Sequence, residues 1–121
     1  MSATAYEHNT QHRRLFESYK LDSPAGVAFL FTDYYSLVER SYLGDYAACD
    51  ILLDLKKAIK LAGISDREWW AIKYSLIYGY LQEEVSKMTG LSQPTISRDI
   101  SEGLTKIAKV FSEWNYGEVK K

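Results

Sequence analysis

The sequence has little of what several classes of protein require. It has a single cysteine, Cys49, so it cannot form an internal disulfide, and its only histidines, His8 and His12, cannot build a zinc site with that cysteine. The longest apolar run, residues 25–31, is too short to cross a bilayer. The first residues of the chain do not show a basic stretch followed by an apolar stretch. We therefore expect no secretion signal, a cytoplasmic location and no membrane partner.

The chain also lacks a surplus of positive charge. It has 15 Lys and Arg residues and 16 Asp and Glu residues, which gives a net charge of -1. Nucleic-acid binders are usually basic, so this balance argues against strong non-specific affinity for DNA but leaves room for a small binding patch. No nucleophile elbow, glycine-rich phosphate loop or metal-ligand spacing is present. We therefore expect neither an enzyme nor a cofactor.

Most of the recognisable sequence patterns are typical of helices. No alternating run and no Asn-Gly or Asp-Gly hairpin predicts a strand, so we expect an all-α fold. The pattern of residues 10–20 is typical of a short helix. Ser23 as a cap and Pro24 at the first helical position predict one helix that runs to about Leu43 and stops at Gly44.

Two further helices follow in the pattern. Asp45 opens the first and Gly63 ends it, and Cys49 within it is expected to be a small buried residue. Its buried stripe consists of Ala48, Ile51, Leu52, Leu55, Ile59 and Ala62. The second helix, about residues 66–78, begins at a capping box formed by Ser65 and Glu68. Because it is apolar almost all round, we expect it to be buried between the N-terminal helices and a C-terminal unit.

The aromatic residues leave two interpretations open. Trp69 and Trp70 either pack in the core, which the lack of a polar face favours, or mark a ligand pocket. The tyrosine-rich stretch of residues 34–42 suits a core and a partner surface equally. Residues 8–14, with their histidines and arginines, form either a basic arm or a solvated tail.

The stretch from residue 81 to residue 100 contains the clearest functional signal. Gly90 allows a positive φ between two helices, and Leu91 provides an apolar plug in the turn. Ser92 caps the second helix. The side chains expected to face inward are Val85, Leu91, Ile96 and Ile100. The residues predicted to bind DNA are Gln82, Ser92, Gln93, Pro94, Thr95, Ser97, Arg98 and Ser101.

The residue types on the outward face suit DNA. An arginine such as Arg98 can donate two hydrogen bonds to guanine, and a glutamine such as Gln93 can pair with adenine. The second helix of such a unit lies in the major groove, and its N-terminal amides suit a phosphate. The alternative is a purely structural helix pair, with Arg98 joined to Glu102 by an ion pair.

Several segments between residues 64 and 110 also follow the pattern of a known family. They are Ser65–Glu68, Gly79–Val85, Gly90–Gln93, Ile96–Arg98, and the trailing apolar residues Leu104, Ile107 and Ala108. These segments resemble region four of bacterial sigma factors and the sigma-like regulators of phages and prophages. The resemblance implies binding to a promoter element and a surface that contacts RNA polymerase.

The chain departs from that family at a few positions. Leu81 stands where the family often has a capping threonine, and Ser86 and Thr89 replace the usual alanine and leucine. The helices before residue 64 show no promoter-melting region. The resemblance therefore favours a small sigma-like regulator over a complete sigma factor.

Together these patterns predict three parts. Residues 1–20 form a tail and a short helix, residues 21–63 a helical region for dimerisation or partner contact, and residues 64–121 a helix-turn-helix domain. We expect a transcription regulator, of phage or prophage origin by resemblance, that binds double-stranded DNA as a homodimer or with RNA polymerase. The alternative is a non-enzymatic interaction protein that binds RNA polymerase or assembles as a phage packaging subunit.

Overall fold

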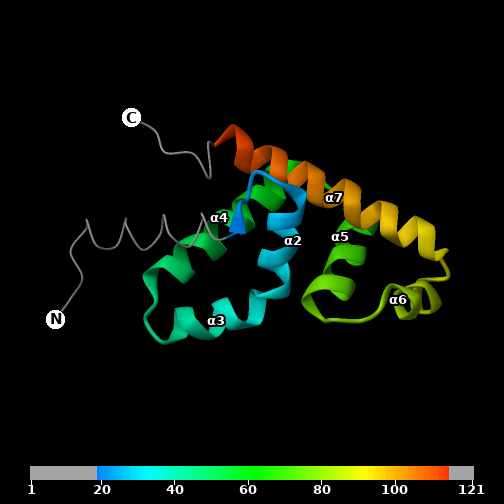
Figure 1. The fold of residues 1–121 in the computed structure, drawn as a ribbon, viewed down its shortest axis with the longest axis horizontal. Coiled ribbons are helices and arrows are strands. Elements are labelled where there is room, and N and C mark those ends of the chain that lie inside the picture. Colours follow the sequence, from blue (N-terminus) through cyan, green and yellow to red (C-terminus); the bar gives the residue numbers. More distant parts are fainter. Residues whose placement is uncertain (1–18, 115–121) are drawn as a thin grey trace.

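The computed structural model describes residues 19–114, and this part of the chain is all helical with no strand (Figure 1). Its elements are α2 (Pro24–Thr32), α3 (Tyr34–Tyr42), α4 (Tyr46–Ala62), α5 (Asp66–Ile72), the π-helical turn η1 (Lys73–Ile77), α6 (Gln82–Thr89) and α7 (Gln93–Glu113). The predicted all-α class is confirmed for these residues. Most of the short helix expected over residues 10–20, and the segment 8–14, lie outside the described part.

The predicted helix ends are confirmed at most positions. The side chains that accept hydrogen bonds from the first turns of α2, α4, α5 and α7 are those of Ser23, Asp45, Ser65 and Ser92. Glu68 completes the capping box, because its carboxylate accepts the Ser65 N–H at 2.9 Å. Gly63 and Gly90 end α4 and α6 with φ values of 67° and 77°, which are in the left-handed region that glycine adopts without strain.

The single helix predicted from Pro24 to Leu43 was wrong, because the chain breaks at Asp33. This residue has φ -92° and ψ 7°, and its carboxylate accepts a hydrogen bond from the Tyr19 hydroxyl at 2.9 Å. The break allows α2 to pack against α7 while α3 packs against α4. A straight helix could not make both contacts.

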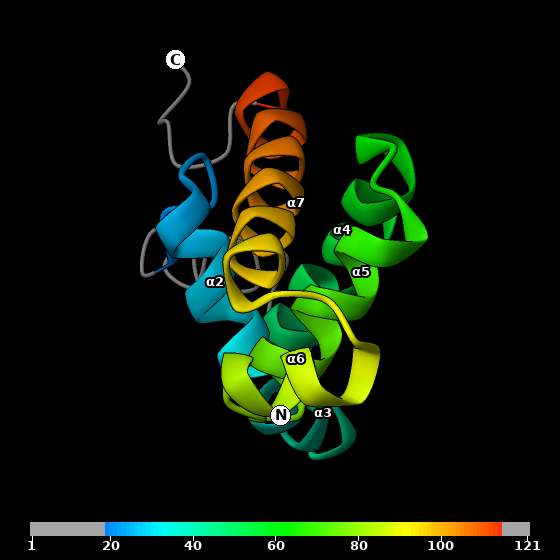
Figure 2. The same ribbon diagram turned by 90° about the vertical axis from the view of Figure 1, so that its right-hand side faces the viewer.

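A single hydrophobic core lies beneath α7, which contacts α2, α4, α5 and α6. Figure 2 shows α7 with α2 on one side and α4 and α5 on the other. The largest fully buried side chains include Leu30, Phe31, Leu37, Ile51, Leu55, Ile72, Val85, Ile96, Ile107 and Phe111. They come from both sides of the predicted boundary near residue 64, so the two expected regions share one core.

The helix predicted over residues 66–78 is less buried than expected. Ala71 and Ile72 face the core, but Trp70 is 42% exposed and stacks on Tyr74 with 4.0 Å between ring centroids. The core interpretation was therefore wrong for Trp70. Trp69 is half-buried and lies 6.0 Å from the Phe31 ring. The physical reason is that α2 and α7 cover only part of this helix, which leaves its remaining face in solvent.

The tyrosine-rich stretch and Cys49 are only partly buried. Tyr34 packs against the core, whereas Tyr35 and Tyr42 are exposed. Cys49 is half-buried, not fully buried as expected, because it lines an open cleft beside α4, and its sulfur lies 3.8 Å from the Ser41 carbonyl oxygen. None of the helices within residues 19–114 combines the length and apolar character needed to cross a membrane.

Candidate nucleic-acid interface

Helices α6 and α7 meet at a short turn at one end of the molecule (Figures 1 and 2). Gly90 reverses the chain, and the Leu91 N–H donates to the Thr89 hydroxyl at 3.2 Å. The Ser86 hydroxyl donates to the Leu91 carbonyl. Ser86 and Thr89 are positions at which the sequence departs from the sigma pattern. Here both hydroxyls supply hydrogen bonds that hold the turn.

The inward side chains of this helix pair lie where the sequence predicts. Val85 and Ile96 are fully or almost fully buried, and Ile100 is 7% exposed. Leu91 is partly buried and packs against the same core. This inward set fixes which face of α7 is directed to solvent.

The outward face of the first half of α7 contains most of the predicted DNA-binding residues. The exposed members are Gln93, Pro94, Ser97, Arg98 and Ser101. Gln93, Ser97 and Ser101 follow one another at four-residue intervals, so they line one side of the helix. At about 1.5 Å per residue, this row is roughly 12 Å long.

The remaining predicted residues have other roles or positions. The Ser92 hydroxyl accepts the Thr95 N–H at 3.3 Å, and the two hydroxyls lie 2.8 Å apart. Ser92 is thus occupied as the N-cap of α7, and Thr95 is half-buried beside it. Gln82 is half-buried and begins α6, at the end of that helix remote from the turn. The structure therefore gathers the predicted set on α7 and leaves Gln82 apart.

Two buried carboxylates, those of Glu68 and Asp99, join α5 to α7 through ion pairs that were not predicted from the sequence. Asp99 accepts hydrogen bonds from Arg67 Nε at 2.8 Å and Nη2 at 3.2 Å, and Glu68 accepts from Lys106 Nζ at 2.9 and 3.1 Å. Burial by itself would raise the pKa of Glu68, but the Ser65 amide and the Lys106 ammonium outweigh burial and hold the pKa below its usual range. The available signal was the position of Asp99 within the inward stripe of α7.

These ion pairs change which cations remain for a ligand. Arg67 and Lys106 are engaged by carboxylates, and Lys87 lies 3.7 Å from Glu83. Within residues 19–114, Arg98 forms no ion pair, so the alternative pairing with Glu102 is not formed. The outward face of the first half of α7 thus presents one guanidinium without an ion pair, among the neutral side chains of Gln93, Ser97 and Ser101 and the exposed carboxylate of Glu102.

The start of α6 is acidic. Glu83 and Glu84 lie in its first turn, and Glu84 accepts the Leu81 N–H at 2.9 Å. Leu81 has no polar side chain that could bond to the amides of this turn in return. Negative charge here stabilises the helix dipole but opposes contact between the start of α6 and a phosphate.

No protein-family model, curated protein or solved structure matches this chain.

Proposed function

We propose that this protein is a sequence-specific, sigma-like transcription regulator that binds double-stranded DNA. In this proposal α6, the turn at Gly90 and α7 form a helix-turn-helix unit, and the first half of α7 enters the major groove. The observation that supports it best is the outward face of α7, where hydrogen-bonding side chains and the unpaired Arg98 stand on a helix fixed by buried neighbours.

The dimensions and chemistry of this face suit base contacts. The row from Gln93 to Ser101 is roughly as long as the major groove is wide, about 12 Å. Arg98 would donate two hydrogen bonds to guanine, and Gln93 would pair with adenine. In the first turn of α7 the Thr95 N–H is held by Ser92 and Pro94 has no N–H. The Gln93 amide would therefore be the group that approaches a phosphate, which the positive end of the helix dipole favours.

The charge of the unit implies that one copy binds weakly. Contacts to phosphates supply much of the affinity of a DNA-binding protein, and here the nearby cations Arg67 and Lys106 are held in ion pairs. Glu83 and Glu84 further reduce the attraction at the start of α6. We therefore propose that a second copy in a homodimer, or RNA polymerase, supplies the missing affinity.

Selection of duplexes from a random pool tests the proposal directly. The purified full chain at low salt is expected to enrich one sequence, and an inverted repeat in it would report a dimer through the spacing of its halves. If no sequence is enriched, the chain does not bind DNA by itself. Repeating the selection with core RNA polymerase then distinguishes a dependent binder from a protein that does not bind DNA.

The role of Arg98 can be tested on the enriched duplex. Arg98→Ala is expected to lower affinity and to relax preference at one base pair by about 1–3 kcal/mol, because the bidentate contact to guanine is lost. Lys109→Ala is the matched control, since Lys109 is an exposed cation on the same helix, about 16 Å further along at 1.5 Å per residue. Unchanged base preference in Arg98→Ala would exclude Arg98 from base recognition.

A second candidate function is that of a protein-interaction unit, as in binding RNA polymerase or assembling a phage packaging complex. The observation that favours it is a cluster of aromatic rings in which the half-buried Tyr74 lies 4.0, 5.0 and 6.1 Å, between ring centroids, from the exposed side chains of Trp70, Tyr78 and Tyr80. Exposed Trp and Tyr are enriched at protein interfaces. Amide NMR spectra separate the two functions: DNA that shifts residues 93–101 favours the regulator.

A further inference from the structure

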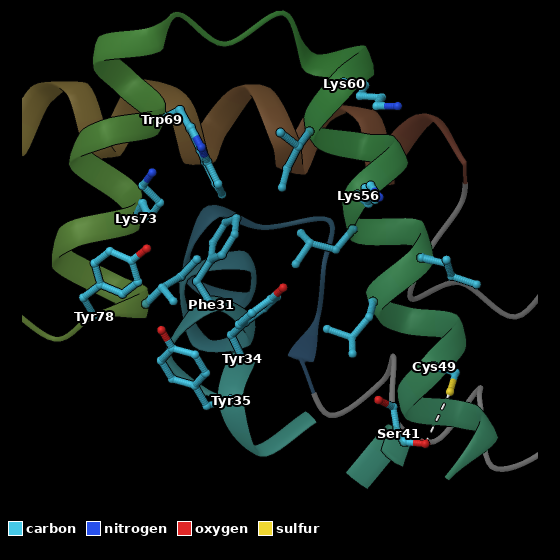
Figure 3. A pocket seen from close by; sticks show the side chains of 15 residues that line it. Phe31, Tyr34, Tyr35, Ser41, Cys49, Lys56, Lys60, Trp69, Lys73 and Tyr78 are labelled. Atoms are coloured by element: carbon cyan, nitrogen blue, oxygen red, sulfur yellow. Dashed lines mark hydrogen bonds between the residues drawn. The ribbon is translucent and has the colours of Figure 1, made fainter. Parts of the chain in front are cut away.

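A cleft with a volume of about 730 Å³ opens between α3 and α4 on one side and α5 and η1 on the other (Figure 3). Phe31 and Tyr34 lie between the two walls, and Trp69 points into the space from the α5 side (Figure 3). Aliphatic side chains of α4 and η1, among them Leu52 and Ile77, complete an apolar lining. Clefts of this size, roughly 300–1,000 Å³, are typical of small-molecule sites.

The charged residues of the cleft all have the same sign. Lys56 and Lys60 lie on the α4 side and Lys73 on the α5 side, and no acidic residue of the described range 19–114 lines the cleft. Within residues 19–114 none of these three lysines forms an ion pair, although the Lys73 ammonium also lies 6.0 Å and 5.6 Å from the ring centroids of Trp70 and Tyr74, outside the cleft. The net charge of the chain is -1, but the lining of this cleft is positively charged, because no carboxylate is paired with its lysines.

Polar groups at the mouth could orient a ligand. Figure 3 shows Tyr35 and Tyr78 facing each other across the opening near Lys73. Their hydroxyls can donate hydrogen bonds, and both side chains are exposed enough to be reached from solvent. An apolar interior with a few convergent polar groups is the usual construction of a specific ligand site.

We propose that this cleft binds a small amphipathic anion, namely a compact aromatic or aliphatic body with one carboxylate or sulfonate. The apolar body would lie against Phe31 and Trp69, where its transfer from water is favourable. The anionic group would remain at the mouth, between Lys73 and Lys56. This site does not depend on the proposed DNA contact, because none of the exposed residues of α7 lines it.

The test uses naphthoate as the probe, with naphthylmethanol and naphthylmethylammonium as its neutral and cationic counterparts. Each is titrated into the full chain and followed by calorimetry and amide NMR spectra. Naphthoate is expected to bind one-to-one and to shift the amides of residues that line the cleft. The neutral analogue should bind more weakly, and the cation more weakly still.

Lysine variants connect that preference to the cleft. Lys56→Gln and Lys73→Gln should each weaken naphthoate binding about two- to fivefold, as expected for partly exposed ion pairs, and should leave naphthylmethanol binding unchanged. Lys57→Gln is the matched control, because Lys57 is an exposed neighbour on α4 that does not line the cleft. Cys49, which lines the cleft, should also be alkylated more slowly by iodoacetamide when naphthoate is present.

Several results would overturn the proposal. Equal affinity for naphthoate and naphthylmethanol would show that the lysines do not select an anion. An equal loss in Lys57→Gln and Lys73→Gln would show that only overall charge matters. Amide shifts confined to the exposed cluster around Trp70 and Tyr80 would place the probe outside the cleft.

Discussion

Removing Arg67 and removing Asp99 should lower the free energy of unfolding by different amounts, although the two residues form one ion pair. The Asp99 side chain is 3% exposed, whereas that of Arg67 is 59% exposed. Arg67→Ala leaves a buried carboxylate without its counterion, and we expect it to lower the free energy of unfolding by about 2–3 kcal/mol. This is below the cost of breaking a fully buried pair, because water reaches the Arg67 side of the site. Asp99→Ala frees Arg67 to turn into solvent and should cost about 1 kcal/mol or less.

Urea denaturation, followed by far-ultraviolet circular dichroism, measures this asymmetry. The double variant Arg67→Ala/Asp99→Ala should be about as stable as Asp99→Ala alone, since the unpaired carboxylate is gone. Lys87→Ala is a control, because its 3.7 Å pair with Glu83 is exposed and should matter little. A larger loss of stability in Asp99→Ala than in Arg67→Ala, or two single losses that simply add in the double variant, would show that an unpaired buried carboxylate is not the source of the cost.

Two further predictions concern the packing of α2 and the pH dependence of stability. Gly26→Ala should lower the free energy of unfolding by about 3 kcal/mol or more. A Cβ at this position would lie 1.8 Å from the Tyr19 carbonyl oxygen, a backbone atom that cannot move aside at low cost. An unchanged urea midpoint would contradict this close contact. The lowered pKa of Glu68 contributes stability that is present above its usual value of 4.5 and is lost as the pH falls through the lowered pKa. Glu68→Gln should therefore be less stable than the unsubstituted chain at neutral pH, and the difference should shrink in acid. A difference in stability that stays constant with pH would show that the Glu68–Lys106 pair is not its cause.

Features that depend on near neighbours in the chain were predictable from the sequence. Ser65 and Glu68 form the predicted capping box, and Gly90 ends α6 in the predicted left-handed conformation. These outcomes follow from hydrogen bonds and backbone sterics within a few residues. Helical periodicity likewise predicted the inward positions of Val85 and Ile96, and with them the face of α7 that is directed to solvent.

Features that join distant segments of the chain could not be predicted, because they depend on how the helices pack. The break at Asp33 depends on α2 and α3 packing against different helices, and no glycine or proline marks it. Asp99 is paired with a residue 32 positions away, and the cleft brings Lys56 of α4 opposite Lys73 of η1. Periodicity states which face of a helix is apolar but not which helix will cover it. The way the helices pack therefore determines which cations stay free for a ligand, and it also forms the cleft that we propose binds an anion.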